Sequence, residues 1–156
     1  KRAEGFDTSR QMLAVARAAL DEMPDEKAAV RFGDIYDPPI ASAAADLVTI
    51  HHVLHYADDP AAALSEAARV VKPGGVVLVV DFSPHDLVEV KRVHAHVHLG
   101  FADNQVQGWL RSAGLNPLEP IHFPGRRLMT GIGPAERELR AGTAPNVTHP
   151  AHGVSR

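Results

Sequence analysis

Histidine and acidic residues follow two short apolar runs in the middle of the sequence. His51 and His52 come directly after the run at residues 46–50, and Asp81 follows the unbroken β-branched run at residues 76–80. Histidine titrates near neutral pH, so its imidazole can accept a proton from a hydroxyl or amine group. These residues could therefore act as a general base, provided that both runs are strands that end at the same edge of a sheet.

The segment between the two runs has the features of a helix. Asp59 and Pro60 are typical of a helix start, and apolar residues recur at helical spacing up to Val71. Pro73-Gly74-Gly75 then ends the helix. A strand, a crossover helix and a second strand predict parallel pairing, and ligands of parallel sheets bind at the carboxyl ends of the strands. We therefore expect the site at the residues that follow these two strands.

Two further acids follow predicted strands closer to the start of the chain. Asp7 comes after a strand predicted over residues 3–6, and Asp34 comes after Gly33 and a strand predicted over residues 28–32. An acid between a strand and a helix can accept both hydroxyls of a ribose, but it also suits a helix N-terminus. Asp34 can accept the exocyclic amine of adenine, or it can simply stabilise a turn.

A helix is predicted to begin at Thr8 or Ser9 and to continue to about Met23. Met12 lies one turn into this helix. It could lie against the face of an adenine ring, although a methionine at helical spacing is more often part of the core.

Several histidines lie at residues 86–99, where we expect a helix that ends at Gly100. His94 and His98 are four residues apart and would share a face. They could bind zinc with a third ligand, such as another histidine, but no fixed spacing identifies one, and we predict no metal site. We expect this helix to cover the acceptor pocket as a lid; the alternative is an ordinary surface helix. The predicted acceptor-binding residues are His85, Arg92, His94 and His98.

The remaining C-terminal part is expected to hold a helix over residues 104–113, capped by Asp103, and then two strands over residues 115–123 and 127–131 that pair as an antiparallel hairpin. Residues 1–140 would form one domain. Residues 141–156 are rich in Gly, Pro, Ala, Thr and His without a hydrophobic period, which predicts a disordered tail.

The composition narrows the range of functions. The 156 residues are 45% hydrophobic, which is enough for a core. A net charge of −3 gives no reason to expect nucleic acid or an anionic membrane as a partner. The absence of cysteine excludes disulfide and thiolate chemistry, and no apolar run approaches the roughly 20 residues of a membrane span. These features fit a cytoplasmic protein, and they leave the oligomeric state open.

Residues 46–82, DLVTIHHVLHYADDPAAALSEAARVVKPGGVVLVVDF, resemble the fourth strand, fourth helix and fifth strand of class I methyltransferases that depend on S-adenosyl-L-methionine (SAM). GFDTSRQMLAVAR resembles the segment that ends their second strand, and FGDIYDPP the one after their third. The resemblance covers about residues 3–115. It implies an α/β, Rossmann-like fold, mostly parallel with antiparallel C-terminal strands, and methyl transfer from SAM to a small-molecule acceptor.

The resemblance also implies roles for individual residues. Asp7 would bind the ribose, Asp34 and the backbone of Ile35 the adenine, while His51 and His52 would border the methyl-transfer site as catalytic residues. The full set of cofactor-binding residues that it implies is Asp7, Thr8, Met12, Asp34, Ile35 and His51. His55 is expected to make a structural hydrogen bond.

The same family begins with a strand, a Gly-rich loop and a helix, and this chain opens inside what would be the second strand. We therefore expect a truncated domain that binds SAM weakly or not at all by itself. Residues 81–115 more narrowly resemble methyltransferase domains fused behind arsenical-resistance-type winged-helix regulators. Two alternatives remain: a non-catalytic domain of a transcriptional regulator that senses SAM or S-adenosylhomocysteine, and a nicotinamide-type Rossmann enzyme.

Overall fold

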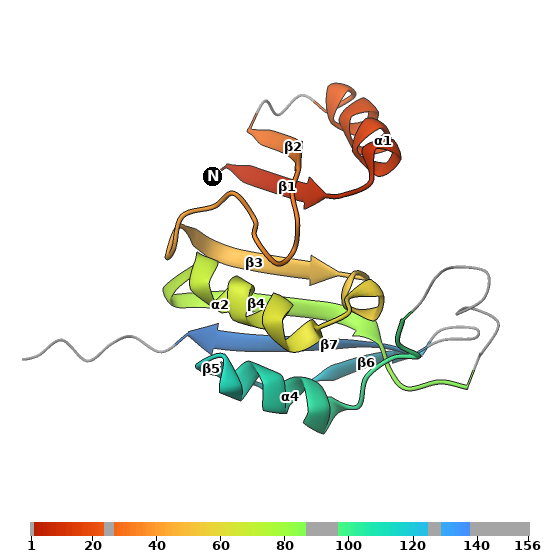
Figure 1. Cartoon of the computed structure of the whole chain (residues 1–156), viewed down its shortest axis with the longest axis vertical. Helices are drawn as coiled ribbons and strands as arrows, with labels where there is room; N and C mark the ends of the chain where they lie inside the picture. The colour runs from red at the N-terminus through yellow and green to blue at the C-terminus, as the bar shows by residue number, and fades with distance from the viewer. Residues whose placement is uncertain (1, 24–26, 87–96, 125–128, 138–156) are drawn as a thin grey trace, which may run out of the picture.

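The computed structural model describes residues 2–23, 27–86, 97–124 and 129–137. It is an α/β fold with two sheets (Figure 1). The smaller sheet pairs β1 (Ala3–Asp7) in parallel with β2 (Ala28–Phe32). The larger sheet has the order β3-β4-β7-β5, and β6 also pairs with β7. Its strands are β3 (Ala45–His51), β4 (Val71–Phe82), β5 (Leu115–Pro117), β6 (Ile121–Pro124) and β7 (Met129–Arg137).

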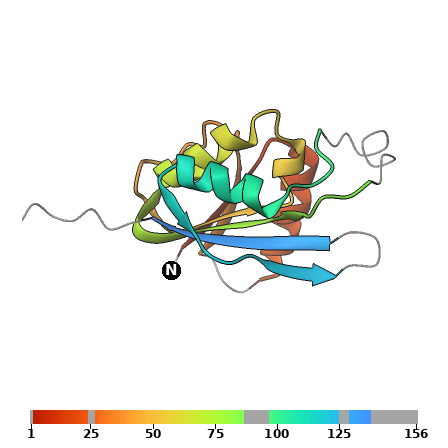
Figure 2. The ribbon, with the colours of Figure 1, turned by 90° about the horizontal axis from the view of Figure 1, so that it is seen from below.

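Three α-helices and one 3₁₀ turn are described: α1 (Arg10–Asp21), η1 (Leu54–Tyr56), α2 (Pro60–Val70) and α4 (Asp103–Ser112). Figure 2 shows α2 and α4 side by side on one face of the larger sheet. The core lies between these helices and the sheet, where Leu54, Leu64, Val77, Leu110 and Leu115 are fully buried. None of the described helices is long and apolar enough to cross a membrane.

Two of the three predicted helix N-caps are confirmed. The Ser9 hydroxyl accepts a hydrogen bond from the Met12 amide at 3.2 Å, and Asp59 Oδ1 accepts one from the Ala62 amide at 3.0 Å. Side-chain oxygens thus satisfy amides that the helix itself leaves unbonded. The prediction for Asp103 was wrong, because the cap of α4 is Ala102. The carboxylate of Asp103 instead lies 2.9 Å from Nε2 of His122.

The Pro-Gly-Gly segment interrupts the pairing of β3 with β4. Ala45 pairs with Val71 and Leu47 with Val76, so the residues between are accommodated as a bulge within β4. Gly74 has a φ of 77°, which favours glycine. A Cβ on Gly75 would lie 2.8 Å from the carbonyl oxygen of Asp46. The prediction that this segment ends the helix and forms a turn was wrong, because α2 ends at Val70 and the segment lies within β4. Its glycines are required by backbone conformation and by close approach.

The C-terminal strands differ from the prediction in their boundaries. The expected strand over residues 115–123 is two strands, β5 and β6, and the break includes Pro120, which has no amide hydrogen to donate. β7 is antiparallel to β4 and β6, which confirms the hairpin, but it continues to Arg137. Continuous pairing with β4 extends this strand through Gly133 and Pro134, residues that disfavour strands.

The two sheets are not joined by backbone hydrogen bonds in the described part of the chain. β1 and β3 run in the same direction in Figure 1, and each pairs with a neighbour on one edge only. Leu47, a large apolar residue of β3, is 58% exposed. Within the described residues, β1 and β3 therefore each have one edge without a paired strand.

Two predictions lie wholly or largely outside the described residues. The tail at residues 141–156 is outside them, and so is most of the expected helix at residues 86–99. The last part of that expected helix is described, and residues 97–99 are not helical.

Candidate functional site

The carboxyl ends of β1, β3 and β4 lie at the same edge of the fold (Figure 1). Asp7 is the last residue of β1, His51 is the last residue of β3, and Asp81 is the penultimate residue of β4. Parallel pairing of β3 with β4 places His51 opposite Val80, next to Asp81. Polar side chains that are 74 positions apart in the sequence therefore gather at the edge where parallel sheets bind ligands.

His55 and Asp81 form a buried pair at the centre of this edge. His55 Nδ1 lies 2.7 Å from Asp81 Oδ1, and the two side chains are 2% and 5% exposed. Asp81 Oδ1 also accepts a hydrogen bond from the Phe82 amide at 2.8 Å. The structural hydrogen bond expected of His55 is confirmed. Its partner was not identified from the sequence, although both residues follow apolar runs that predict adjacent parallel strands.

The backbone around His55 is held by the segment that follows residue 96. The carbonyl oxygen of His55 accepts hydrogen bonds from the amides of Val97 and His98, at 2.9 and 3.1 Å. Nε2 of His98 also lies 3.0 Å from the carbonyl oxygen of Ala57. His98, predicted to contact an acceptor, thus binds the protein's own backbone, while the predicted acceptor residues Arg92 and His94 lie outside the described residues.

His52 is the half-buried histidine of the site. Its φ of 52° lies in the left-handed region, and its amide donates to the carbonyl oxygen of Val80 at 2.8 Å. The ring centroid lies 4.6 Å from that of Phe82 and 4.7 Å from that of His51. Burial lowers the pKa of His52 and outweighs the opposite effect of nearby Asp81. The imidazole is therefore neutral at neutral pH, the form that can accept a proton.

His51 and His85 complete the polar groups at this edge. His51 is exposed. The amide of His85 donates to the carbonyl oxygen of Leu99 at 3.1 Å, and its ring centroid lies 6.1 Å from that of Phe82. His85 therefore lies next to the cluster around Asp81, whereas His51 is open to solvent.

Asp7 and its neighbours form a second group at the end of the smaller sheet. Asp7 Oδ1 accepts a hydrogen bond from the Ser9 amide at 2.7 Å, so one carboxylate oxygen stabilises the entry to α1. Thr8 is exposed, and Met12 is 54% exposed on α1. Met12 is therefore not the core residue that its spacing favoured, and the helix surface beside Asp7 presents an apolar side chain to solvent.

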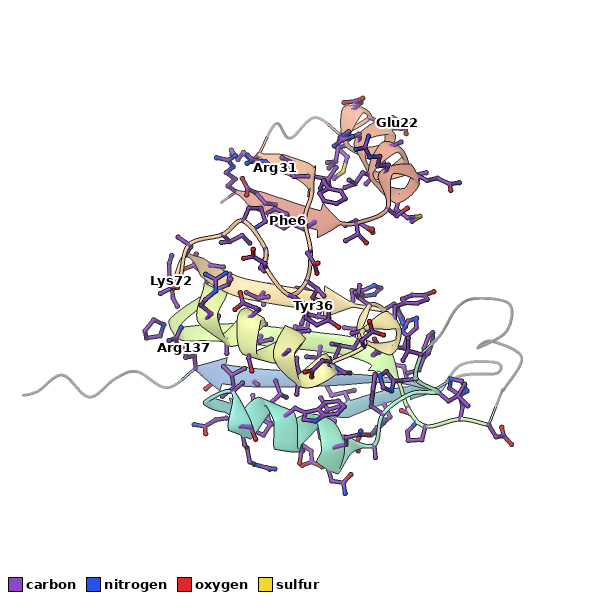
Figure 3. The ribbon with its side chains drawn as sticks, in the orientation of Figure 1. Phe6, Glu22, Arg31, Tyr36, Lys72 and Arg137 are labelled. Atoms are coloured by element: carbon purple, nitrogen blue, oxygen red, sulfur yellow. The ribbon has the colours of Figure 1, made fainter. Side chains whose placement is uncertain are left out.

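Asp34 begins the loop that joins the two sheets. Its Oδ1 accepts a hydrogen bond from the Tyr36 amide at 3.0 Å, which is the turn interaction considered as the alternative to ligand binding. The Tyr36 hydroxyl in turn accepts from the Asp59 amide at 2.9 Å (Figure 3). Ile35 and Tyr36 also pack against the core. The loop is thus fixed to the start of α2, while the carboxylate of Asp34 stays exposed.

A pocket lies beside Asp81, between β4 and α4. Its lining is mainly apolar and includes Phe82, Phe101 and Leu110, with the polar residues Ser83 and Gln107. Neither Asp7 nor Asp34 lines it. The pocket therefore adjoins the histidine cluster and is separate from the residues expected to hold a nucleoside.

The sequence was compared with protein families and with known proteins. The profile of a methyltransferase domain family matches residues 1–79. An uncharacterized methyltransferase of Schizosaccharomyces pombe is 32% identical over 124 residues, which cover 67% of this chain and 45% of that protein. The chain spans less than half of the length of the curated relatives that it matches.

Solved structures share the fold. A methyltransferase candidate from Bacillus halodurans is similar with a TM-score of 0.78 and 20% identity, over 89% of this chain and 84% of that one. An S-adenosylmethionine-dependent methyltransferase from Mesorhizobium loti is similar with a TM-score of 0.72 and 19% identity, over 87% and 80% of the two chains. At these identities the likeness concerns the fold alone, which is the predicted Rossmann-like α/β fold.

Proposed function

The chain belongs to the methyltransferase domain family whose profile it matches, and we propose that it transfers a methyl group from SAM to a small-molecule acceptor. One observation carries the proposal. Acids that can hold a nucleoside and histidines that can accept a proton lie at the carboxyl ends of strands that run in the same direction, with Asp7 at the end of β1 and His52 after β3 (Figure 1). The narrower resemblance to domains fused behind winged-helix regulators stays a prediction.

The nucleoside part of SAM would be held by residues that follow the first two strands. Asp7 would accept hydrogen bonds from the ribose hydroxyls. Only its Oδ1 is bonded within the described residues, so Oδ2 can take this role. Asp34 and the Ile35 amide would contact adenine, and the exposed Met12 would lie against its face. These contacts use groups that the fold places at the surface beside the strand ends.

SAM, when bound, supplies an electrophilic methyl group, and the chain's own residues would position the acceptor and remove its proton. Catalysis of an in-line displacement rests mainly on such positioning. The new bond joins the methyl carbon to the acceptor atom, and the broken bond leaves its electrons on sulfur. Neutral His52 would accept the proton that the acceptor loses, and exposed His51 would border the same space. Both histidines are proposals for catalytic residues.

One further parallel strand would fit the unpaired edges of β1 and β3. We propose that this strand carries the Gly-rich loop for the methionine end of SAM. Glycines allow the backbone to approach a ligand closely at a helix N-terminus. A following helix would cover exposed Leu47. We therefore expect strong SAM binding only in a protein in which this strand, Gly-rich loop and helix are present.

The test is calorimetric titration of SAM into the protein with a strand, Gly-rich loop and helix placed before residue 3. Asp7→Ala should weaken binding by about 1–3 kcal/mol, the scale of lost charged hydrogen bonds. Asp21→Ala, which removes an exposed acid at the far end of α1, is the matched control and should not change it. Equal SAM affinities of Asp7→Ala and the unmodified protein would contradict the assignment of Asp7 to the ribose. A failure to transfer the methyl group to any acceptor would contradict the proposed enzymatic activity.

A further inference from the structure

We propose that His52, His55 and Asp81 form a binding site for a divalent transition-metal ion, with Zn²⁺ as the ion to test first. Each residue offers one ligand atom, and these three atoms all lie within 4.8 Å of one another. They come from the loop after β3 and from the end of β4, so parallel pairing brings them together. The inference rests on the donor atoms alone and not on methyl transfer. A metal-bound imidazole has no free lone pair for a proton, so a bound ion would exclude His52 as the proposed proton acceptor.

The chemistry of the three donors suits such an ion. Two imidazoles and one carboxylate are common ligands of Zn²⁺ and of related transition metals, whereas Mg²⁺ and Ca²⁺ prefer oxygen ligands throughout. Three protein ligands leave a further coordination position open. This number is typical of catalytic metal sites, whereas structural zinc sites usually have four protein ligands.

Two polar atoms of the cluster are buried without a hydrogen-bond partner among the described residues: His52 Nδ1 and Asp81 Oδ2. Most buried polar atoms in folded proteins have a partner, and leaving one without costs free energy. Asp81 Oδ1 is already bonded to His55 and to the Phe82 amide. These bonds fix the carboxylate so that Oδ2 is the oxygen available to an ion. A bound cation would satisfy both atoms at once.

The protein holds the three residues in place and leaves one of them accessible. Asp81 lies near the end of β4, a strand that is paired with β3 on one side and with β7 on the other, and the backbone of His55 is bonded to Val97 and His98. His52 is half-buried, so an ion can reach the cluster from its side.

Metal binding would change the hydrogen bond between His55 and Asp81. If Nδ1 of His55 is the ligand, its proton must leave, so binding releases protons and weakens at acidic pH. The sequence did not suggest this set of ligands. It drew attention to the histidines at four-residue spacing in 94–98, whereas the cluster joins residues separated by the whole of α2.

The test is direct binding of Zn²⁺ to the intact chain. Protein treated with EDTA and then dialysed against Zn²⁺ should retain about one equivalent by mass spectrometry of the metal, and calorimetry should give its affinity. His52→Ala should weaken that affinity by at least about tenfold. Even substitutions of residues that only hydrogen-bond to a metal ligand commonly lower metal affinity by about 10–100-fold. Two controls should leave it unchanged: His122→Ala, which removes an exposed histidine of β6, and the double variant His94→Ala/His96→Ala.

His52→Ala is the decisive variant because it leaves the buried His55–Asp81 pair intact, and circular dichroism should show an unchanged fold. Equal Zn²⁺ affinity of His52→Ala and the unmodified protein would overturn the proposal. Loss of Zn²⁺ binding in the double variant alone would also overturn it. So would a failure of the protein to retain stoichiometric metal; the two unpartnered atoms would then be sites for water or for a hydroxyl of the acceptor. Co²⁺ in place of Zn²⁺ should give a visible spectrum that His52→Ala alters.

Discussion

His55 Nδ1 and Asp81 Oδ1 lie 2.7 Å apart, and both side chains are almost completely buried. This hydrogen bond joins the turn after β3 to the end of β4 across the strand pair on which the candidate site is built. Together with the bond from the His52 amide to the Val80 carbonyl oxygen, it fixes the turn that carries His52 to the end of β4. Any role of the site depends on this pair, whether the site holds an acceptor or a metal ion.

We expect His55→Ala to lower the free energy of unfolding by about 3–5 kcal/mol, because it leaves a buried carboxylate without its side-chain partner. Urea denaturation followed by circular dichroism measures the change. His51→Ala is the matched control, since His51 is exposed in the same segment. Its effect should stay within about 0.5 kcal/mol. Equal stability of the two variants would show that the pair contributes little.

Two glycines offer a test of the packing in this fold. Gly75→Ala should destabilise the protein by about 1–3 kcal/mol, since the new Cβ would lie 2.7 Å from Val71 Cγ2 and 2.8 Å from the Asp46 carbonyl oxygen. Gly108→Ala should instead stabilise it by about 0.5–1 kcal/mol, because Gly108 lies inside α4 with no atom within 4 Å of an added Cβ. Thermal unfolding of the two variants shows whether each substitution raises or lowers stability. An unchanged stability of Gly75→Ala would contradict the bulge geometry.

His52 should titrate below the 6.5 of an unperturbed histidine, because burial penalises its charged form. NMR of the ring protons in the presence of EDTA measures this pKa, with the unfolded chain as reference. The unfolded chain then binds the proton more readily than the folded protein. The contribution of His52 to stability is therefore present above pH 6.5 and is lost as the pH falls toward its lowered pKa. A pKa at or above 6.5 would contradict the burial of the ring.

Much of the fold could be predicted from the sequence because its signals are local. The β-branched run after Gly75 lies within β4, although β4 already begins at Val71, and the Asp59-Pro60 pair begins α2. The break between β5 and β6 was missed, as was the extension of β7 through Gly133 and Pro134. In β7, continuous pairing with β4 outweighs the weak strand preference of these residues.

The site was predicted less completely, since its geometry depends on contacts between distant residues. The strand ends identified Asp7, His52 and Asp81 as members of the candidate site. The partner of His55 depends on the register of β3 with β4 and on the path of η1, which the spacing of residues does not encode. The exposure of Met12 likewise depends on what packs against α1, so helical spacing alone favoured the core.

The exposure of Met12 supports one more prediction, which rests on the proposed binding of SAM. In the protein with the additional strand, loop and helix, Met12→Ala should weaken SAM binding by about 0.3–1.5 kcal/mol, the range of contacts between sulfur and an aromatic ring. Val15→Ala is the matched control, because Val15 is an apolar residue of the same helix that is 60% exposed. Calorimetry gives both affinities, and denaturation should show that neither variant loses more than about 0.5 kcal/mol of stability. Equal affinities of the two variants would place adenine away from Met12, and a large loss of stability in Met12→Ala would make Met12 a packing residue after all.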